Sequence, residues 1–200
     1  MGLSMSEIQM FAINNPVALV TAGLLALALV VVWLFYNRLA ALDERCETAL
    51  ADIDALLKHR HDLIPGLIET VRGFAGHESA VLTEVTRARA SALQAHRTDM
   101  RLEAETQLGQ SINSLLSVVE KYPDLQAGSH FSGLRAELTD THNRITAARR
   151  FYNLAVNEFN ATLRQFPANL VGALTRLARR KAFDVGAQRE TLEAPIALKF

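Results

Sequence analysis

Residues 17–35, VALVTAGLLALALVVVWLF, form a run of nineteen positions without a charged side chain. At about 1.5 Å per residue, a helix of this length spans roughly 29 Å, close to the hydrocarbon thickness of a bilayer. Trp33 and Tyr36 lie at its C-terminal edge and Arg38 follows, an order typical of the headgroup level. The residues before the run contain no Lys or Arg, and the run is longer than the h-region of a cleaved signal peptide. We therefore predict an uncleaved transmembrane helix.

The flanking charges predict how this helix is oriented. Only Glu7 precedes it, whereas Arg38, Arg45 and Lys58 follow it. Cationic residues are enriched on the cytoplasmic side of membrane helices. We expect the N-terminus to lie outside and the rest of the chain to lie in the cytoplasm.

Small residues recur on one face of the predicted anchor. Ala18, Ala22 and Ala26 are spaced by four, and Gly23 lies beside them. Such a face allows close approach of a second membrane helix, although the same alanines can simply face lipid. The residues that we assign to the anchor are Val17, Ala18, Ala22, Gly23, Ala26, Trp33, Tyr36 and Arg38.

The chain beyond the anchor repeats apolar residues in alternating steps of three and four, which is typical of packed helices. Pro65 interrupts the first repeat and predicts a kink or a restart of the helix. A turn is expected between Tyr122 and Gly133, and Pro167 ends the last repeat. The predicted fold is all-α, with the transmembrane helix continuing into an antiparallel up-down four-helix bundle of long, coiled-coil-like helices. The core positions that define the repeats are Leu39, Leu42, Cys46, Ala49, Ile53, Leu56, Leu67, Val71, Phe74, Leu82, Val85, Ala88, Ala92, Leu102, Leu108, Ile112, Leu115, Val119, Leu134, Leu138, Thr141, Ile145, Ala148, Tyr152, Ala155, Phe159, Thr162 and Phe166.

The segment from His59 to Glu78, HRHDLIPGLIETVRGFAGHE, collects histidines and acids around Pro65 and Gly66. His59 and His61 point about 200° apart on a helix, so they do not converge on one ion unless the chain folds back. No HExxH motif is present. We interpret the segment as a bend, with His61, Asp62, Pro65 and Gly66 as candidates for contact with a neighbouring protomer.

Polar residues near the core stripe of the last long helix suggest a second set of assembly residues. A buried amide can fix helix register or oligomeric state. An exposed polar face is the alternative. The candidates are Tyr152, Asn153, Asn157 and Asn160.

After Pro167 we predict a short basic amphipathic helix and then an extended tail that includes Pro195. The basic residues Arg176, Arg179, Arg180 and Lys181 are candidates for contact with anionic lipid, or they face solvent. The formal net charge of the chain is zero, which gives no general attraction to nucleic acid. Cys46 is the only cysteine, and we find neither a phosphate-binding loop nor a nucleophile–base motif. No cofactor is predicted.

Several motifs together resemble the LemA family of bacterial membrane proteins. They are YNRL at residues 36–39, LADID at 50–54, RHDLIPGLIETVRGFAGHE at 60–78, RFYNLAVN at 150–157 and FPANL at 166–170. The resemblance implies one N-terminal transmembrane helix with its N-terminus outside, a helical bundle in the cytoplasm, and no known catalytic activity. The more basic end of the chain departs from the family pattern.

These features predict a non-enzymatic scaffold anchored in the bacterial inner membrane. It would bind membrane lipids, self-associate into a homo-oligomer and organise unidentified protein partners, but not nucleic acid. A ligand-sensing or signalling bundle is an alternative, and a metal-dependent enzyme built on the His59–Glu78 segment is a weaker one. The predicted divisions are residues 1–16 (N-terminal segment), 17–36 (transmembrane helix), 37–166 (bundle), 167–182 (basic helix) and 183–200 (tail).

Overall fold

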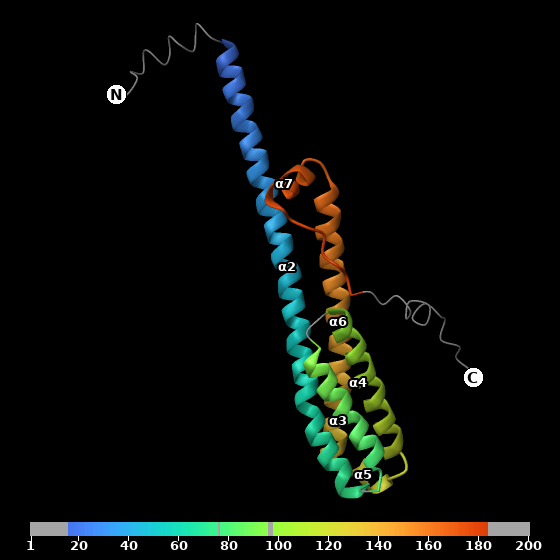
Figure 1. Cartoon of the computed structure of the whole chain (residues 1–200). Helices are drawn as coiled ribbons and strands as arrows, with labels where there is room; N and C mark the ends of the chain where they lie inside the picture. The colour runs from blue at the N-terminus through green and yellow to red at the C-terminus, as the bar shows by residue number, and fades with distance from the viewer. Residues whose placement is uncertain (1–15, 76, 96–97, 184–200) are drawn as a thin grey trace, which may run out of the picture. The chain divides into compact units, whose positions relative to one another are not determined.

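The computed structural model describes residues 16–75, 77–95 and 98–183, and within these ranges every regular element is an α-helix. The prediction of an all-α chain is confirmed over that part. The expected tail and N-terminal segment fall almost entirely outside the described residues. The helices are α2 (Pro16–Phe74), α3 (Ser79–Gln94), α4 (Thr98–Val119), α5 (Pro123–Ala127), α6 (Ser129–Arg164) and α7 (Ala168–Thr175) (Figure 1).

Helix α2 begins with the apolar run, and its side chains from Val17 to Val30 are all exposed. By length and composition it is able to cross a membrane, and it is the one such helix among the described residues. No acidic or basic residue falls between its start and Arg38. The predicted long N-terminal apolar helix is therefore present.

Helix α2 passes through Pro65 without ending, so the predicted restart is wrong. Proline lacks the N–H that would bond to the carbonyl of His61, four residues earlier. That carbonyl instead accepts a hydrogen bond of 2.9 Å from Nε of Arg89 in α3. The carbonyl that Pro65 leaves without a donor is thus hydrogen-bonded by a side chain of another helix. The chain turns only after Phe74, where the N–H of Glu78 bonds to the carbonyl of Ala75.

The chain divides into two compact units, and α2 and α6 contribute to both. Unit 1 contains Met1–Glu47 and Leu154–Ala182, and unit 2 contains Thr48–Asn153 and Phe183–Phe200. Each unit has buried residues spaced in steps of three and four, as the repeats predicted. The division at 36/37 and 166/167 remains a prediction.

Unit 2 has one hydrophobic core to which α2, α3, α4, α5 and α6 contribute. In Figure 1 their colours run from the blue and cyan of α2 through the greens of α3 and α4 to the gold and orange of α6. The segment expected to be a turn between Tyr122 and Gly133 is largely helical, because Leu125 and Phe131 are buried in this core and order it. The fully buried side chains include Ile64, Leu67, Val71, Val85, Leu108, Leu115, Val119, Leu125 and Phe131.

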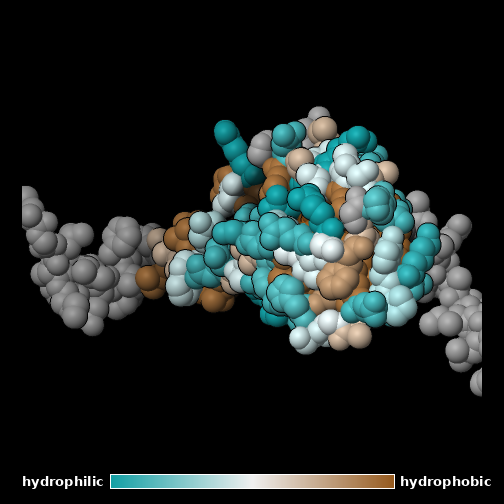
Figure 2. Space-filling view, turned by 90° about the horizontal axis from the view of Figure 1, so that it is seen from below, coloured by the Kyte–Doolittle hydropathy of each residue, from teal (hydrophilic) through white to brown (hydrophobic). Residues whose placement is uncertain are grey.

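The end of unit 2 that carries α5 has a mainly hydrophilic surface, with small hydrophobic areas between the polar groups (Figure 2). Phe74 contributes an exposed ring, with 57% of its surface accessible, so its predicted core position is wrong. It is the last residue of α2.

Unit 1 packs one face of α2 with the end of α6 and with α7. Its buried residues include Leu39, Leu42, Cys46, Ala155, Val156, Phe159, Ala168 and Val171. Burial raises the pKa of the Cys46 thiol, with a smaller opposing effect from the charge of Arg180. Phe166, expected in the core, is 79% exposed because α6 ends at Arg164, before it.

Helix α7 ends at Thr175, so the predicted basic helix does not extend through residues 176–182. Arg176 adopts a left-handed conformation (φ 58°), and the N–H of Leu177 bonds to the carbonyl of Gly172. This pattern closes a helix end. Residues 176–183 therefore leave the helix as an irregular segment, named here the C-terminal strap.

Candidate functional site

The histidines of the predicted corner are separated in the structure. Nε2 of His59 lies 3.2 Å from Oε1 of Glu137 on the surface of unit 2, whereas His61 is 6% exposed. Asp62 and His77 are exposed. Within the described residues, no three His, Cys, Asp or Glu side chains form a set that could hold a metal ion.

A buried cluster of charges lies instead between α2 and α4 in unit 2. Arg60 is 4% exposed and Glu105 is 2% exposed, and the two form a salt bridge. Nη2 of Arg60 also donates a hydrogen bond to the backbone carbonyl of Glu105 at 3.4 Å. Nε2 of His61 lies 2.9 Å from Oε1 of Glu105, but neither atom has an aligned hydrogen-bond partner in the described part of the chain. His61, expected at an interface, is thus placed in the interior.

Electrostatics keeps Glu105 ionised despite its burial. Removal from water by itself raises the pKa of a carboxyl group. Contact with His61 and the charge of Arg60 outweigh this effect and hold the pKa of Glu105 below its ordinary value. The cluster therefore contains a stable buried carboxylate.

A further arginine, Arg149 of α6, lies beside this cluster and lines the same cavity as Arg60 and Glu105. Burial, and then the charge of Arg60, lower the pKa of Arg149 from its ordinary value. Its Nε atom is buried without a hydrogen-bond partner among the described residues. Asp54 of α2 pairs with Arg101 of α4 at 2.8 Å.

The C-terminal strap is held in unit 1 through the main chain and the side chain of Arg180. Asn160 donates from Nδ2 to the Arg180 carbonyl at 2.9 Å and accepts the Arg180 N–H at 3.0 Å. The guanidinium of Arg180 donates to Asp43 and to Glu47 of α2, each at 2.6 Å. These bonds raise the pKa of Arg180. The structure therefore directs Arg180 at carboxylates of its own chain, whereas Arg176, Arg179 and Lys181 are exposed.

A second asparagine binds the last described residue of the strap in unit 2. Asn153 donates to the carbonyl of Phe183 at 3.1 Å and accepts its N–H at 2.8 Å. The rings of Tyr152 and Phe183 contact edge to face, with centroids 4.9 Å apart. Of the three asparagines assigned to assembly, only Asn157 is exposed.

The family model of the LemA family matches residues 49–200, which is most of the chain. The chain belongs to the LemA family. This assignment confirms the resemblance seen in the sequence motifs. It covers both arginines of the buried cavity, its carboxylate and both strap-binding asparagines.

Two curated relatives illustrate the range of the LemA family. Magnetosome protein MamQ 1 of Paramagnetospirillum magneticum is 19% identical, with 74% of this chain and 64% of the relative covered. Protein LemA of Metamycoplasma hominis is 25% identical, with 68% and 62% covered. The chain thus spans less than two thirds of the length of these relatives.

Sequence reasoning missed the charged residues of the cavity, although a signal was present. Arg60 continues the buried series of α2 between Leu57 and Ile64, in steps of three and four. Glu105 begins the series that continues at Leu108 in α4. Arg149 lies beside Ala148, the core position given by the repeat of α6, and is four residues after Ile145 and three before Tyr152. Charged residues at core positions of α2 and α4, with another beside the core of α6, indicate a charged site inside unit 2.

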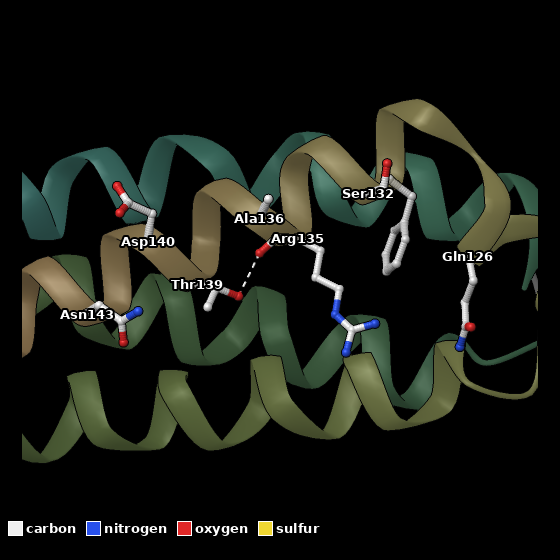
Figure 3. Close-up of a pocket in the computed structure, with 8 residues that line it drawn as sticks. Gln126, Ser132, Arg135, Ala136, Thr139, Asp140 and Asn143 are labelled. Carbon is white, nitrogen blue, oxygen red and sulfur yellow. Dashed lines mark hydrogen bonds between the residues drawn. The ribbon is translucent and has the colours of Figure 1, made fainter.

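A larger hollow of about 500 Å³ lies on the outside of unit 2. It is lined mostly by one face of α6, with Gln126 from α5 (Figure 3). Its Thr139 hydroxyl donates to the carbonyl of Arg135 at 2.8 Å, so this donor is already used. The LemA-family chain therefore offers the cavity lined by Arg60, Glu105 and Arg149, rather than this surface, as the site where charged side chains of three helices meet.

Proposed function

We propose that this chain is a non-enzymatic membrane scaffold whose helical part lies in the bacterial cytoplasm and self-associates. The observation that carries the proposal is the continuity of α2. One helix contains both an exposed apolar run able to cross a membrane and the residues from Leu39 to Val71 that are buried in the two units. A helix of this kind joins the membrane directly to a packed protein surface.

The proposal includes an antiparallel up-down arrangement of the helices in unit 2. Side-chain contacts join α2 to α4 through Arg60 and Glu105, and α2 to α6 through His59 and Glu137. The bond from Arg89 to the carbonyl of His61 joins α3 to α2. The short connections between successive helices favour antiparallel neighbours.

Exposed apolar residues in unit 1 support self-association. Leu154, Phe166, Leu170 and Leu174 each expose more than half of their surface. Exposed apolar groups in such number favour a protein or membrane contact. The relatives also include proteins named as magnetosome proteins, and an assembly role at such a structure is consistent with the proposal.

The first test measures the mass of the full-length protein in mild detergent by mass photometry. We expect a discrete homo-oligomer, and the double variant Leu170→Gln/Leu174→Gln is expected to shift it toward monomer. Met100→Gln is the matched control, since Met100 is also an exposed apolar residue but lies in α4 of unit 2. A wild-type protein that is strictly monomeric would rule out self-association.

The second test concerns orientation. In a Cys46→Ser background, Asp62→Cys places one thiol at an exposed site. An impermeant maleimide added to intact spheroplasts should leave this thiol unlabelled, and it should react after the membrane is opened. Labelling in intact spheroplasts would reverse the proposed topology.

A further inference from the structure

The cavity between α2, α4 and α6 in unit 2 has an excess of positive charge. Its volume is about 380 Å³, within the range of small-molecule sites. Two arginines, Arg60 and Arg149, line it, but only one carboxylate does, that of Glu105. Glu105 is already paired with Arg60. In the described part of the chain, Arg149 has no acidic side chain within ion-pairing distance, and Glu105, which already pairs with Arg60, offsets its charge only in part.

The remaining lining divides into polar and apolar groups. Thr106 and Thr146 use their hydroxyl protons in bonds to the carbonyls of Leu102 and His142 of their own helices. The threonines therefore offer acceptors only, and the donors available to a ligand are the arginine and amide N–H groups and the imidazole of His142. The apolar part of the lining consists of Ile112, Leu116, Leu138 and Ile145.

Water alone does not meet the electrostatic requirement of this cavity. A charge withdrawn from bulk water is costly unless an opposite charge approaches it. Arg60 is more than nine-tenths buried, and its Nε atom, like that of Arg149, has no hydrogen-bond partner among the described residues. An anion that bonds to Arg149 would balance the charge of the cluster, and an attached hydrocarbon group would cover the apolar wall.

We propose that this cavity binds a small organic monocarboxylate, with the carboxylate at Arg149 and the hydrocarbon part against Ile112 and Ile145. The inference goes beyond the proposed scaffold function, because a scaffold needs no ligand. Arg149 presents a planar fork of donors that fits a carboxylate. Glu105 keeps Arg60 in place and repels a second negative charge, which favours a monoanion over a dianion.

The test is isothermal titration calorimetry of the full-length protein in detergent with sodium hexanoate. Arg149→Gln should weaken hexanoate binding about tenfold or more, the usual effect of losing a charge-assisted hydrogen bond. Arg150→Gln is the matched control, since Arg150 is the next residue but is exposed. It should leave the affinity unchanged. Hexanamide, which has the same chain without the charge, should not bind.

Inorganic phosphate provides a second arm. Phosphate that binds as tightly as hexanoate would overturn the assignment to a carboxylate with an apolar chain. If hexanoate did not bind, or if Arg149→Gln and Arg150→Gln lowered its affinity equally, the proposed site would be wrong. A thermal melt checks folding of each variant. Arg149→Gln removes a half-buried charge and should not lower the melting temperature, so loss of binding will report on the ligand contact.

Discussion

At the scale of single residues, the carboxylate of Glu105 has the clearest energetic role. It is buried beside Arg60 and His61, and its loss leaves the arginine charge in the interior without compensation. We expect Glu105→Gln to lower the free energy of unfolding by about 3 kcal/mol or more, as is usual when one partner of a buried pair is removed. Urea unfolding followed by circular dichroism measures it. The exposed Glu103→Gln is the control, and equal losses would contradict the assignment.

The same residue predicts an acid-sensitive fold. Because the pKa of Glu105 is lowered in the folded protein, its contribution to stability is present above the ordinary carboxyl pKa. That contribution is lost as the pH falls below the ordinary carboxyl range and through the lowered pKa of the folded protein. Stability measured between neutral pH and that range should fall more steeply in the wild type than in Glu105→Gln. Parallel curves would show that Glu105 does not titrate in this way.

The sequence repeats predict which cavity residues of α2 and α4 face inward, but not which residues pair with one another. The repeats mark Arg60 and Glu105 as inward positions, whereas the repeat of α6 takes Ala148 rather than its neighbour Arg149. Arg60 and Glu105 are 45 residues apart in sequence, and their pairing depends on how three helices are aligned. A single helix period carries no information on that alignment.

At the scale of elements, the continuity of α2 through Pro65 depends on Arg89 of α3. We expect Arg89→Gln to lower the free energy of unfolding by about 1–2 kcal/mol, because the carbonyl of His61 loses its donor. In a Pro65→Ala background, the restored backbone N–H can bond to that carbonyl, and Arg89→Gln should cost less. A double-mutant cycle measures this coupling, with the exposed Arg87→Gln as control. If the two substitutions lowered the free energy of unfolding additively, Arg89 would not be what allows α2 to continue through Pro65.

The C-terminal strap gives a second prediction for an element. Asn160→Ala removes both hydrogen bonds to the backbone of Arg180. We expect trypsin to cleave after Arg176 and Arg179 about tenfold faster, as local opening becomes easier. Asn157→Ala is the matched control on the same helix, since Asn157 is exposed. Unchanged cleavage in Asn160→Ala would show that Asp43 and Glu47 hold the strap without it.

The elements show where prediction from the sequence succeeds and where it stops. The helices and most of their buried faces follow from the three-and-four repeats. Their ends did not follow, because they depend on contacts that are distant in sequence. Arg89 donates the hydrogen bond that Pro65 cannot give to the carbonyl of His61, so α2 continues. The left-handed conformation of Arg176 ends α7 where a longer basic helix was expected.

At the scale of the whole molecule, the exposed apolar run of α2 predicts membrane dependence. Leu27→Arg places a charge at the middle of the run and should oppose insertion by about 3 kcal/mol. The measurement is the fraction of the chain that remains in membranes after alkaline carbonate extraction. Ala41→Arg, also exposed but beyond the run, should have no effect. Equal retention of both variants would argue against a spanning helix.

Unit 1 joins two segments that are made at different times during synthesis. Residues Leu154–Ala182 leave the ribosome only after the whole intervening stretch, Thr48–Asn153, has been translated. At ordinary rates of about 5–20 residues per second, that delay is on the order of ten seconds. Throughout it, Leu39, Leu42 and Cys46 have emerged without the later segment of their unit. A nascent chain of this kind needs a chaperone or the membrane surface to shield that face until translation ends.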